Sequence, residues 1–185
     1  MRFFDPSLLV LLVLAALAAM IGGAAPAQAQ AYRSEATDLQ VTLPAGWDGT
    51  QAIDETALPG RATYRFEATA PGIAGAVLVI ERVTGLNPLA QEQFRRGQVQ
   101  FGYHGLRPTA GLPESAMVFG PGAGASLAAG ERTGRVYFVQ RGRIYWAVHL
   151  SAPASALADR PDLFDALAAG VRLSDTRVAP DGGEG

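Results

Sequence analysis

The strongest local signal in the chain is Arg135-Val-Tyr-Phe-Val-Gln-Arg-Gly-Arg-Ile-Tyr-Trp-Ala-Val-His-Leu-Ser151. Two runs rich in β-branched and aromatic residues flank Arg141 and Gly142, and a glycine can adopt the positive φ that a tight turn requires. The segment therefore predicts a β-hairpin with its tip at Arg141-Gly142. This tip sets the cross-strand pairs Val139–Ile144, Tyr137–Trp146, Phe138–Tyr145 and Val136–Ala147.

Both faces of the predicted hairpin are apolar, because residues that pair across the strands share a face. One face carries Tyr137, Val139, Ile144, Trp146 and Val148, and the other carries Val136, Phe138, Tyr145 and Ala147. A hairpin with one face in water would alternate apolar with polar residues. The pattern therefore predicts a hairpin in the middle of a sheet that is covered on both faces.

The composition excludes several classes of function. The 185 residues carry a net charge of -2 and no cluster of basic residues, which argues against a nucleic-acid partner. The absence of cysteine excludes disulfides, thiolate metal sites, cysteine nucleophiles and a lipid-modified cysteine. About 150 residues remain beyond the N-terminal segment, a usual size for one domain.

Residues 1–29 have the features of a secretory signal peptide. Arg2 precedes an apolar run over residues 8–23, and small residues with Ala-x-Ala spacing follow it. The alternative is a retained membrane anchor, because the apolar run approaches the length of a bilayer span. Gly22-Gly23, followed by alternating alanine and glutamine, favours cleavage and an exported, periplasmic or extracellular protein without a stable membrane anchor.

The rest of the chain predicts strands, two helices and a tail. Strands are expected over residues 39–43, 62–68, 76–83, 115–119 and 125–131. One helix begins at Asn87-Pro88, with asparagine as N-cap, and runs to Tyr103; the second covers residues 161–170. Trp47 is expected to close one end of the core. Residues 174–185 are polar and glycine-rich, which predicts a disordered tail.

No motif in the sequence indicates catalysis, a cofactor or a metal. The segment 124–128 lacks the second glycine of a hydrolase nucleophile elbow, and His104 and His149 do not have metal-ligand spacing. We expect His149 to be a hydrogen-bonded strand residue and His104 to be a cation at the end of the first helix.

The remaining candidate positions are an acid after an apolar run and a loop. Glu81 follows an apolar run and is expected to form a strand-end ion pair with Arg65 or Arg82. The loop at residues 120–124 is small and has no core residue, and rigid scaffolds often carry recognition on such connections. We therefore predict that a partner contacts Gly120, Pro121, Gly122, Ala123 and Gly124; if this loop is only a connector, the exposed face of the helix at residues 87–103 is the alternative.

Three segments resemble the PsbP/Mog1/DcrB-like superfamily of small α/β/α proteins. These are Leu43-Pro-Ala-Gly-Trp47, Gly142-Arg-Ile-Tyr-Trp-Ala-Val148 and Phe164-Asp-Ala-Leu-Ala-Ala-Gly-Val-Arg-Leu173. The resemblance implies an α+β fold over residues 36–173, with a central antiparallel sheet flanked by helices on both faces. Members of the superfamily mostly act as accessory, assembly or binding proteins, and many DcrB-like members are envelope lipoproteins. The absence of cysteine here points to a soluble exported form, and no site residue matches.

We therefore expect an exported, non-enzymatic accessory or binding domain that acts on a protein partner in the cell envelope. The alternative is a carrier that holds a small molecule or lipid between sheet and helix. The third hypothesis is an enzyme, which would require Glu67, Glu81 and His149 to meet in one cleft.

We predict that the exported protein begins between Gln28 and Tyr32, because the three Ala-x-Ala sites place cleavage there. Intact-mass measurement of the exported protein checks this position. Retention of Met1 on a protein recovered with the membrane would instead identify the apolar run as an anchor.

Overall fold

The computed structural model describes residues 29–34, 36–37, 39–44, 47, 50–58, 60–98 and 103–173. Apart from residue 29, the predicted signal peptide lies outside the described residues, and so does the predicted tail at residues 174–185. The first strand begins at Gln30, so ordered structure starts before the expected domain boundary at residue 36.

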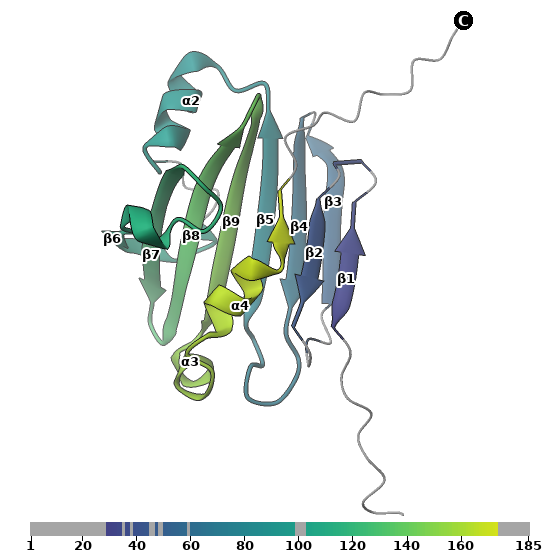
Figure 1. The fold of residues 1–185 in the computed structure, drawn as a ribbon, viewed down its shortest axis with the longest axis vertical. Coiled ribbons are helices and arrows are strands. Elements are labelled where there is room, and N and C mark those ends of the chain that lie inside the picture. Colours follow the sequence, from purple (N-terminus) through teal and green to yellow (C-terminus); the bar gives the residue numbers. More distant parts are fainter. Residues whose placement is uncertain are drawn as a thin grey trace, which may run out of the picture.

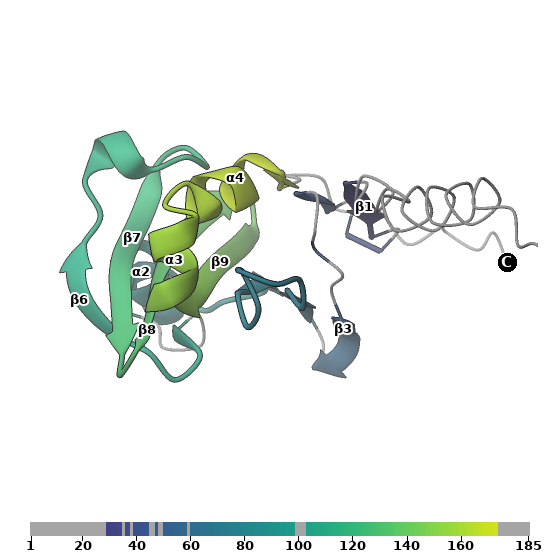
Figure 2. The same cartoon turned by 90° about the horizontal axis from the view of Figure 1, so that it is seen from below.

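The described residues form two antiparallel sheets (Figure 1). The three-stranded sheet has the order β1-β2-β10, with β1 (Gln30–Arg33), β2 (Gln40–Leu43) and β10 (Val171–Arg172). The seven-stranded sheet has the order β3-β4-β5-β9-β8-β7-β6. Its strands are β3 (Thr50–Leu58), β4 (Arg61–Glu67), β5 (Val77–Thr84), β6 (Arg107–Gly111), β7 (Gly122–Ala129), β8 (Arg132–Arg141) and β9 (Ile144–Pro153). Figure 2 shows β6 and β7 at one end of the molecule and β1 and β3 at the other.

The helices are short. They are α2 (Pro88–Arg95), α3 (Ala154–Asp159), α4 (Leu163–Ala169) and the 3₁₀ turn η2 (Glu114–Ala116). The N-cap prediction is confirmed, because the Asn87 side chain accepts a hydrogen bond from the Ala90 amide at 2.9 Å. The predicted extension to Tyr103 is wrong: α2 ends at Arg95, and Gly97 turns the chain away with a φ of 67°.

The predicted fold, a sheet flanked by helices on both faces in an α/β/α sandwich, is wrong, because strands dominate the described chain. The three α-helices among the described residues contain only 8, 6 and 7 residues. The three-stranded sheet covers part of the same face of the large sheet as α4. It does so through Val41 and Leu43 of β2 and the preceding Leu39. Apolar and polar residues alternate along β2, so one side of this strand is buried and the other is exposed. This alternation suits a strand of a sheet that packs on the core with one face.

The hairpin at residues 135–151 is confirmed, but its register differs from the prediction by two residues. Val139 pairs with Trp146, and Tyr137 pairs with Val148, so all four predicted pairs are wrong. Arg141 pairs with Ile144, which leaves Gly142 first in a two-residue turn with a φ of 57°. A type II′ turn requires a positive φ at that position.

The two predicted faces are nevertheless confirmed, because a register shift of two residues leaves every side chain on its original side of the sheet. The cluster of Tyr137, Val139, Ile144, Trp146 and Val148 lies on one side of the sheet, and Val136, Phe138, Tyr145 and Ala147 lie on the other. β9 is buried from Ile144 to Ala152 and sits between β5 and β8. The predicted central, doubly covered position is therefore confirmed.

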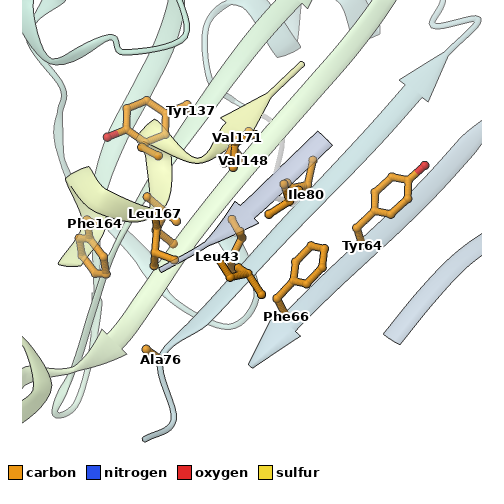
Figure 3. Packing of buried hydrophobic residues seen from close by; sticks show 14 of the residues in the cluster. Leu43, Tyr64, Phe66, Ala76, Ile80, Tyr137, Val148, Phe164, Leu167 and Val171 are labelled. Atoms are coloured by element: carbon orange, nitrogen blue, oxygen red, sulfur yellow. The ribbon is translucent and has the colours of Figure 1, made fainter. Parts of the chain in front are cut away.

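The larger core lies between the two sheets and α4. Figure 3 shows Leu43 from β2, Tyr64 and Phe66 from β4, and Phe164 and Leu167 from α4 gathered over the large sheet. Trp47 belongs to the same cluster at 1% exposure, which confirms its predicted role in the core. The smaller core lies on the opposite face, where Phe94 of α2 packs on β8 and β9.

Several local predictions need correction. Residues 115–119 were expected to form a strand, but Glu114–Ala116 is a 3₁₀ turn. β7 begins at Gly122, three residues earlier than predicted, and α3 was not predicted. The helix expected over residues 161–170 is present as α4, and its expected apolar face is buried.

Gly170 connects α4 to the second sheet through a contact that leaves no room for a side chain. Its carbonyl accepts from the Thr42 amide at 2.8 Å, and a Cβ on Gly170 would lie 2.0 Å from the Thr42 oxygen. We expect Gly170→Ala to lower the free energy of unfolding by about 1–3 kcal/mol, measured by urea denaturation. Gly111→Ala is the control, since its Cβ would meet nothing closer than 4.0 Å. Equal stability of the two variants would contradict the packing described here.

Candidate functional site

Two adjoining hollows open beside α2. The larger, of ≈ 560 Å³, lies between the end of α2 and the ends of β7 and β8, and it is lined by Phe94, Arg95, Pro121, Gly122, Phe138, Gln140 and Gly142. The smaller, of ≈ 360 Å³, is lined by Gly85, Leu86, Gln91, Gln140, Gly142, Arg143 and Tyr145. Gln140 and Gly142 belong to both, so the hollows form one continuous depression, named here the α2 groove.

The floor of the α2 groove is an aromatic cluster. Phe94, the one fully buried residue of α2, meets Phe138 edge-to-face at 5.3 Å between ring centroids, and it meets Tyr145 at 5.2 Å. Such edge-to-face pairs are favourable beyond the area they bury. The floor is therefore closely packed, and α2, which carries Phe94, begins after the Asn87 cap and ends before Gly97.

The rim of the α2 groove is basic. Among the described residues that line it, Arg95 and Arg143 are the charged ones, and none is a carboxylate. Glu92 lies nearby on α2 and pairs with Arg96 at 2.7 Å and with Arg95 at 3.0 Å. These arginines, Arg96 first, lower the pKa of Glu92 below its usual value, so its charge is matched by two cations.

The predicted contact loop at residues 120–124 is only partly a loop. Gly122, Ala123 and Gly124 lie in β7, and a Cβ on Gly122 would stand 2.2 Å from the Phe138 carbonyl oxygen. Gly120 and Pro121 form the turn before β7. Gly120, Pro121 and Gly122 also line a hollow of ≈ 540 Å³ with Leu112, Glu114 and Met117.

That third hollow lies on the other face of the sheet. Leu112 and Met117 pack against the larger core, whereas Phe94 and Phe138 belong to the smaller one. Pro121-Gly122 therefore separates two hollows, and the predicted loop borders the α2 groove without forming most of it. The sequence alone does not predict this groove, because the groove exists only where α2 meets strands that follow it in the chain.

A separate polar cluster lies on the same face of the sheet as α2. Glu81 of β5 is 2% exposed, forms an ion pair with Arg61 of β4, and lies 3.5 Å from Nε2 of His104. The His104 ring stands 4.9 Å from the ring of His149 on β9. Three residues from distant parts of the sequence are therefore brought into contact.

His149 is buried without a hydrogen bond. It is 1% exposed, and neither Nδ1 nor Nε2 has a hydrogen-bond partner. Burial lowers the pKa of His149 to about 3, and repulsion from His104, Arg132 and Arg65 adds to the effect. The imidazole is therefore neutral at physiological pH, because the folded site disfavours its charged form.

These positions correct three predictions. His149 lies in a strand as expected but is not hydrogen-bonded. His104 is not a helix-terminal cation, since α2 ends at Arg95. Glu81 forms its ion pair with Arg61, not with the expected Arg65 or Arg82.

The three residues of the enzyme hypothesis, Glu67, Glu81 and His149, do not meet in one cleft. Glu81 and His149 share a face through His104, whereas Glu67 pairs with Arg65 at 3.2 Å and its side chain is 41% exposed. The hollows described above are lined by other residues. Within the described ranges, no group of three histidine, cysteine, aspartate or glutamate side chains is placed to hold a metal ion.

No protein-family model matches the chain, and comparison with curated proteins finds no match either. The resemblance to the PsbP/Mog1/DcrB-like superfamily therefore stays a prediction. Of the helices that the structure describes, none is long and apolar enough to cross a membrane.

We predict that His149 makes the folded protein less stable in acid. Its pKa rises from about 3 in the folded state to the ordinary 6.5 on unfolding, so the unfolded chain binds the extra proton between these values. The free energy of unfolding should fall by about 1.4 kcal/mol per pH unit below pH 6.5 because of this residue. Urea denaturation of wild type and His149→Gln, compared from pH 7.5 to 4.5, isolates the effect. Parallel pH profiles would contradict it.

Proposed function

We propose that the protein is an exported binding domain that holds an extended acidic segment of a partner protein of the cell envelope in the α2 groove. The observation that carries this proposal is an open groove beside α2, underlain by the buried Phe94 and Phe138, whose described charges, Arg95 and Arg143, are both positive. Export is expected from the leader-like sequence at residues 1–29.

Each part of the α2 groove suits a different part of an extended peptide. An apolar or aromatic side chain can pack on the exposed Pro121 of the larger hollow, and acidic side chains can pair with the two arginines. Gly122 and Gly142 carry no side chain, so the peptide backbone can approach the sheet ends closely. A segment that occupies both hollows passes Gln140 and Gly142, which line each of them.

The α2 groove is formed before any partner arrives. Phe94 packs edge-to-face on Phe138 and Tyr145 and so fixes α2 on the sheet, and the Asn87 cap and the Glu92 ion pairs stabilise the helix itself. A preformed site loses less conformational entropy on binding than one that must order itself. Most of the conformational entropy lost on binding is then lost by the partner segment.

The carrier hypothesis has less support. It expects an apolar ligand between the sheet and the helix, but the rings of Phe94, Phe138 and Tyr145 pack directly against one another there. The remaining space is the open groove at the end of α2, whose basic rim suits an acidic ligand better than a wholly apolar one.

We expect peptides selected from a random library by the exported protein to combine an aromatic or aliphatic residue with flanking acidic residues. Arg95→Gln should weaken binding of a selected peptide about tenfold, since a charge-assisted hydrogen bond contributes about 1.5–3 kcal/mol. Fluorescence anisotropy of the labelled peptide measures this loss.

Arg96→Gln is the matched control. Arg96 has the same charge, follows Arg95 directly and also pairs with Glu92, but it lines a different hollow with Gly97 and Tyr103. Its replacement should change peptide affinity less than threefold or so. Equal losses in both variants, or selected peptides without acidic residues, would refute the α2 groove as the binding site.

A further inference from the structure

Residues 103–106 form a tight turn that covers the buried His149. The Leu106 amide donates to the Tyr103 carbonyl at 2.9 Å, and the central residues His104 and Gly105 have φ values of 46° and 84°. Positive φ at both central positions defines a type I′ turn. Among the described residues, His104 is the only one other than glycine with positive φ, so this conformation is maintained by its contacts.

Four contacts hold the 103–106 turn against the sheet. His104 lies 3.5 Å from Glu81, and its ring is tilted by 46° to the ring of His149 at 4.9 Å between centroids. Leu106 packs over Gly134 of β8, where a Cβ would lie 3.1 Å from Leu106 Cδ2, and the Tyr103 ring meets Phe138 at 6.1 Å. Two of these four contacts join His104 to titratable groups, so the turn responds to the charge of those groups.

The charged groups whose charge acts on His149 include two arginines, and the carboxylate of the cluster faces His104. Arg65 of β4 lies in the same cross-strand row and pairs with Glu67, and Arg132 of β8 donates to the Gly75 carbonyl and to Ser151. Glu81 of β5 pairs with Arg61 through Oε1, whereas its Oε2 has no hydrogen-bond partner and faces His104 at 3.5 Å. A protonated His149 would therefore add a cation beside Arg65, Arg132 and His104.

We propose that the 103–106 turn is a proton-operated latch, which closes over neutral His149 and opens when His149 takes up a proton. Opening lets water reach the imidazolium and separates it from His104. The hairpin of β8 and β9 stays intact, because its ladder pairs do not include the turn. This inference is independent of the proposed function, since it concerns the polar cluster and not the α2 groove.

The direction of the effect follows from where the proton binds. The closed form holds the pKa of His149 at about 3, whereas an exposed imidazole has the ordinary value of 6.5. Between these values only the open form is protonated, so opening becomes more favourable as pH falls. From about pH 7.5 to pH 5 the equilibrium constant for opening should rise about 30-fold.

The Leu106 amide reports opening directly, because its hydrogen bond to Tyr103 closes the turn. Native-state hydrogen exchange followed by NMR, corrected for the intrinsic pH dependence of exchange, gives the opening constant of this amide. Amides of Val136 and Val148 serve as the internal reference for the intact hairpin. We expect the Leu106 constant to rise about 30-fold over this pH range while the reference amides change much less.

Two variants separate the roles of the histidines. His149→Gln removes the titrating group, and its Leu106 exchange should lose the pH dependence. His104→Asn keeps a residue that tolerates positive φ and leaves His149 in place, so its pH dependence should remain. Persistent pH dependence in His149→Gln, or its loss in His104→Asn, would overturn the latch.

A measurement on wild type avoids reliance on folding of the variants. Imidazole NMR signals of His149 should show protonation only together with loss of Leu106 protection. Protonation of His149 while Leu106 stays protected would mean that Glu81 accepts the new N–H in place, and the latch would be wrong.

Discussion

Burial of β9 on both faces is the constraint on which the rest of the structure depends. β9 pairs with β5 on one side and β8 on the other, and its side chains alternate between the two cores. Each fully buried aliphatic residue, such as Ile144, Val148 or Leu150, contributes about 1.5–3 kcal/mol. Both faces must therefore be covered, and the second sheet with α4 covers one while α2 and the 103–106 turn cover the other.

The two coverings differ in chemistry. The larger core contains Trp47, Phe66 and Trp146 and is closed by β2, α4 and β10. The opposite face is divided between the aromatic floor beneath α2 and the polar cluster of Glu81, His104 and His149. The face with the smaller apolar core is therefore the one where the α2 groove opens. The same face holds His149, whose ring nitrogens have no hydrogen-bond partner.

The α2 groove and the 103–106 turn meet at Phe138. Its ring lies under Phe94 in the floor of the groove and 6.1 Å from the ring of Tyr103, which donates to the Gly97 carbonyl just beyond α2. A packed aromatic pair transmits displacement, because protein interiors have few voids that could absorb it. The end of α2 and the turn over His149 are thus parts of one packed face.

Local patterns in the sequence determined the hairpin, its two apolar faces, the Asn87 cap, the burial of Trp47 and the apolar face of α4, since each depends on residues close together in the chain. Only the tertiary structure decided the rest. The hairpin register depends on a choice between two turns, with Gly142 second or first, that the local pattern leaves open, and the second sheet depends on β2 pairing with β10 from the far end of the chain. The α2 groove and the contact of Glu81, His104 and His149 join residues that lie far apart in sequence, and no local periodicity reports such a contact.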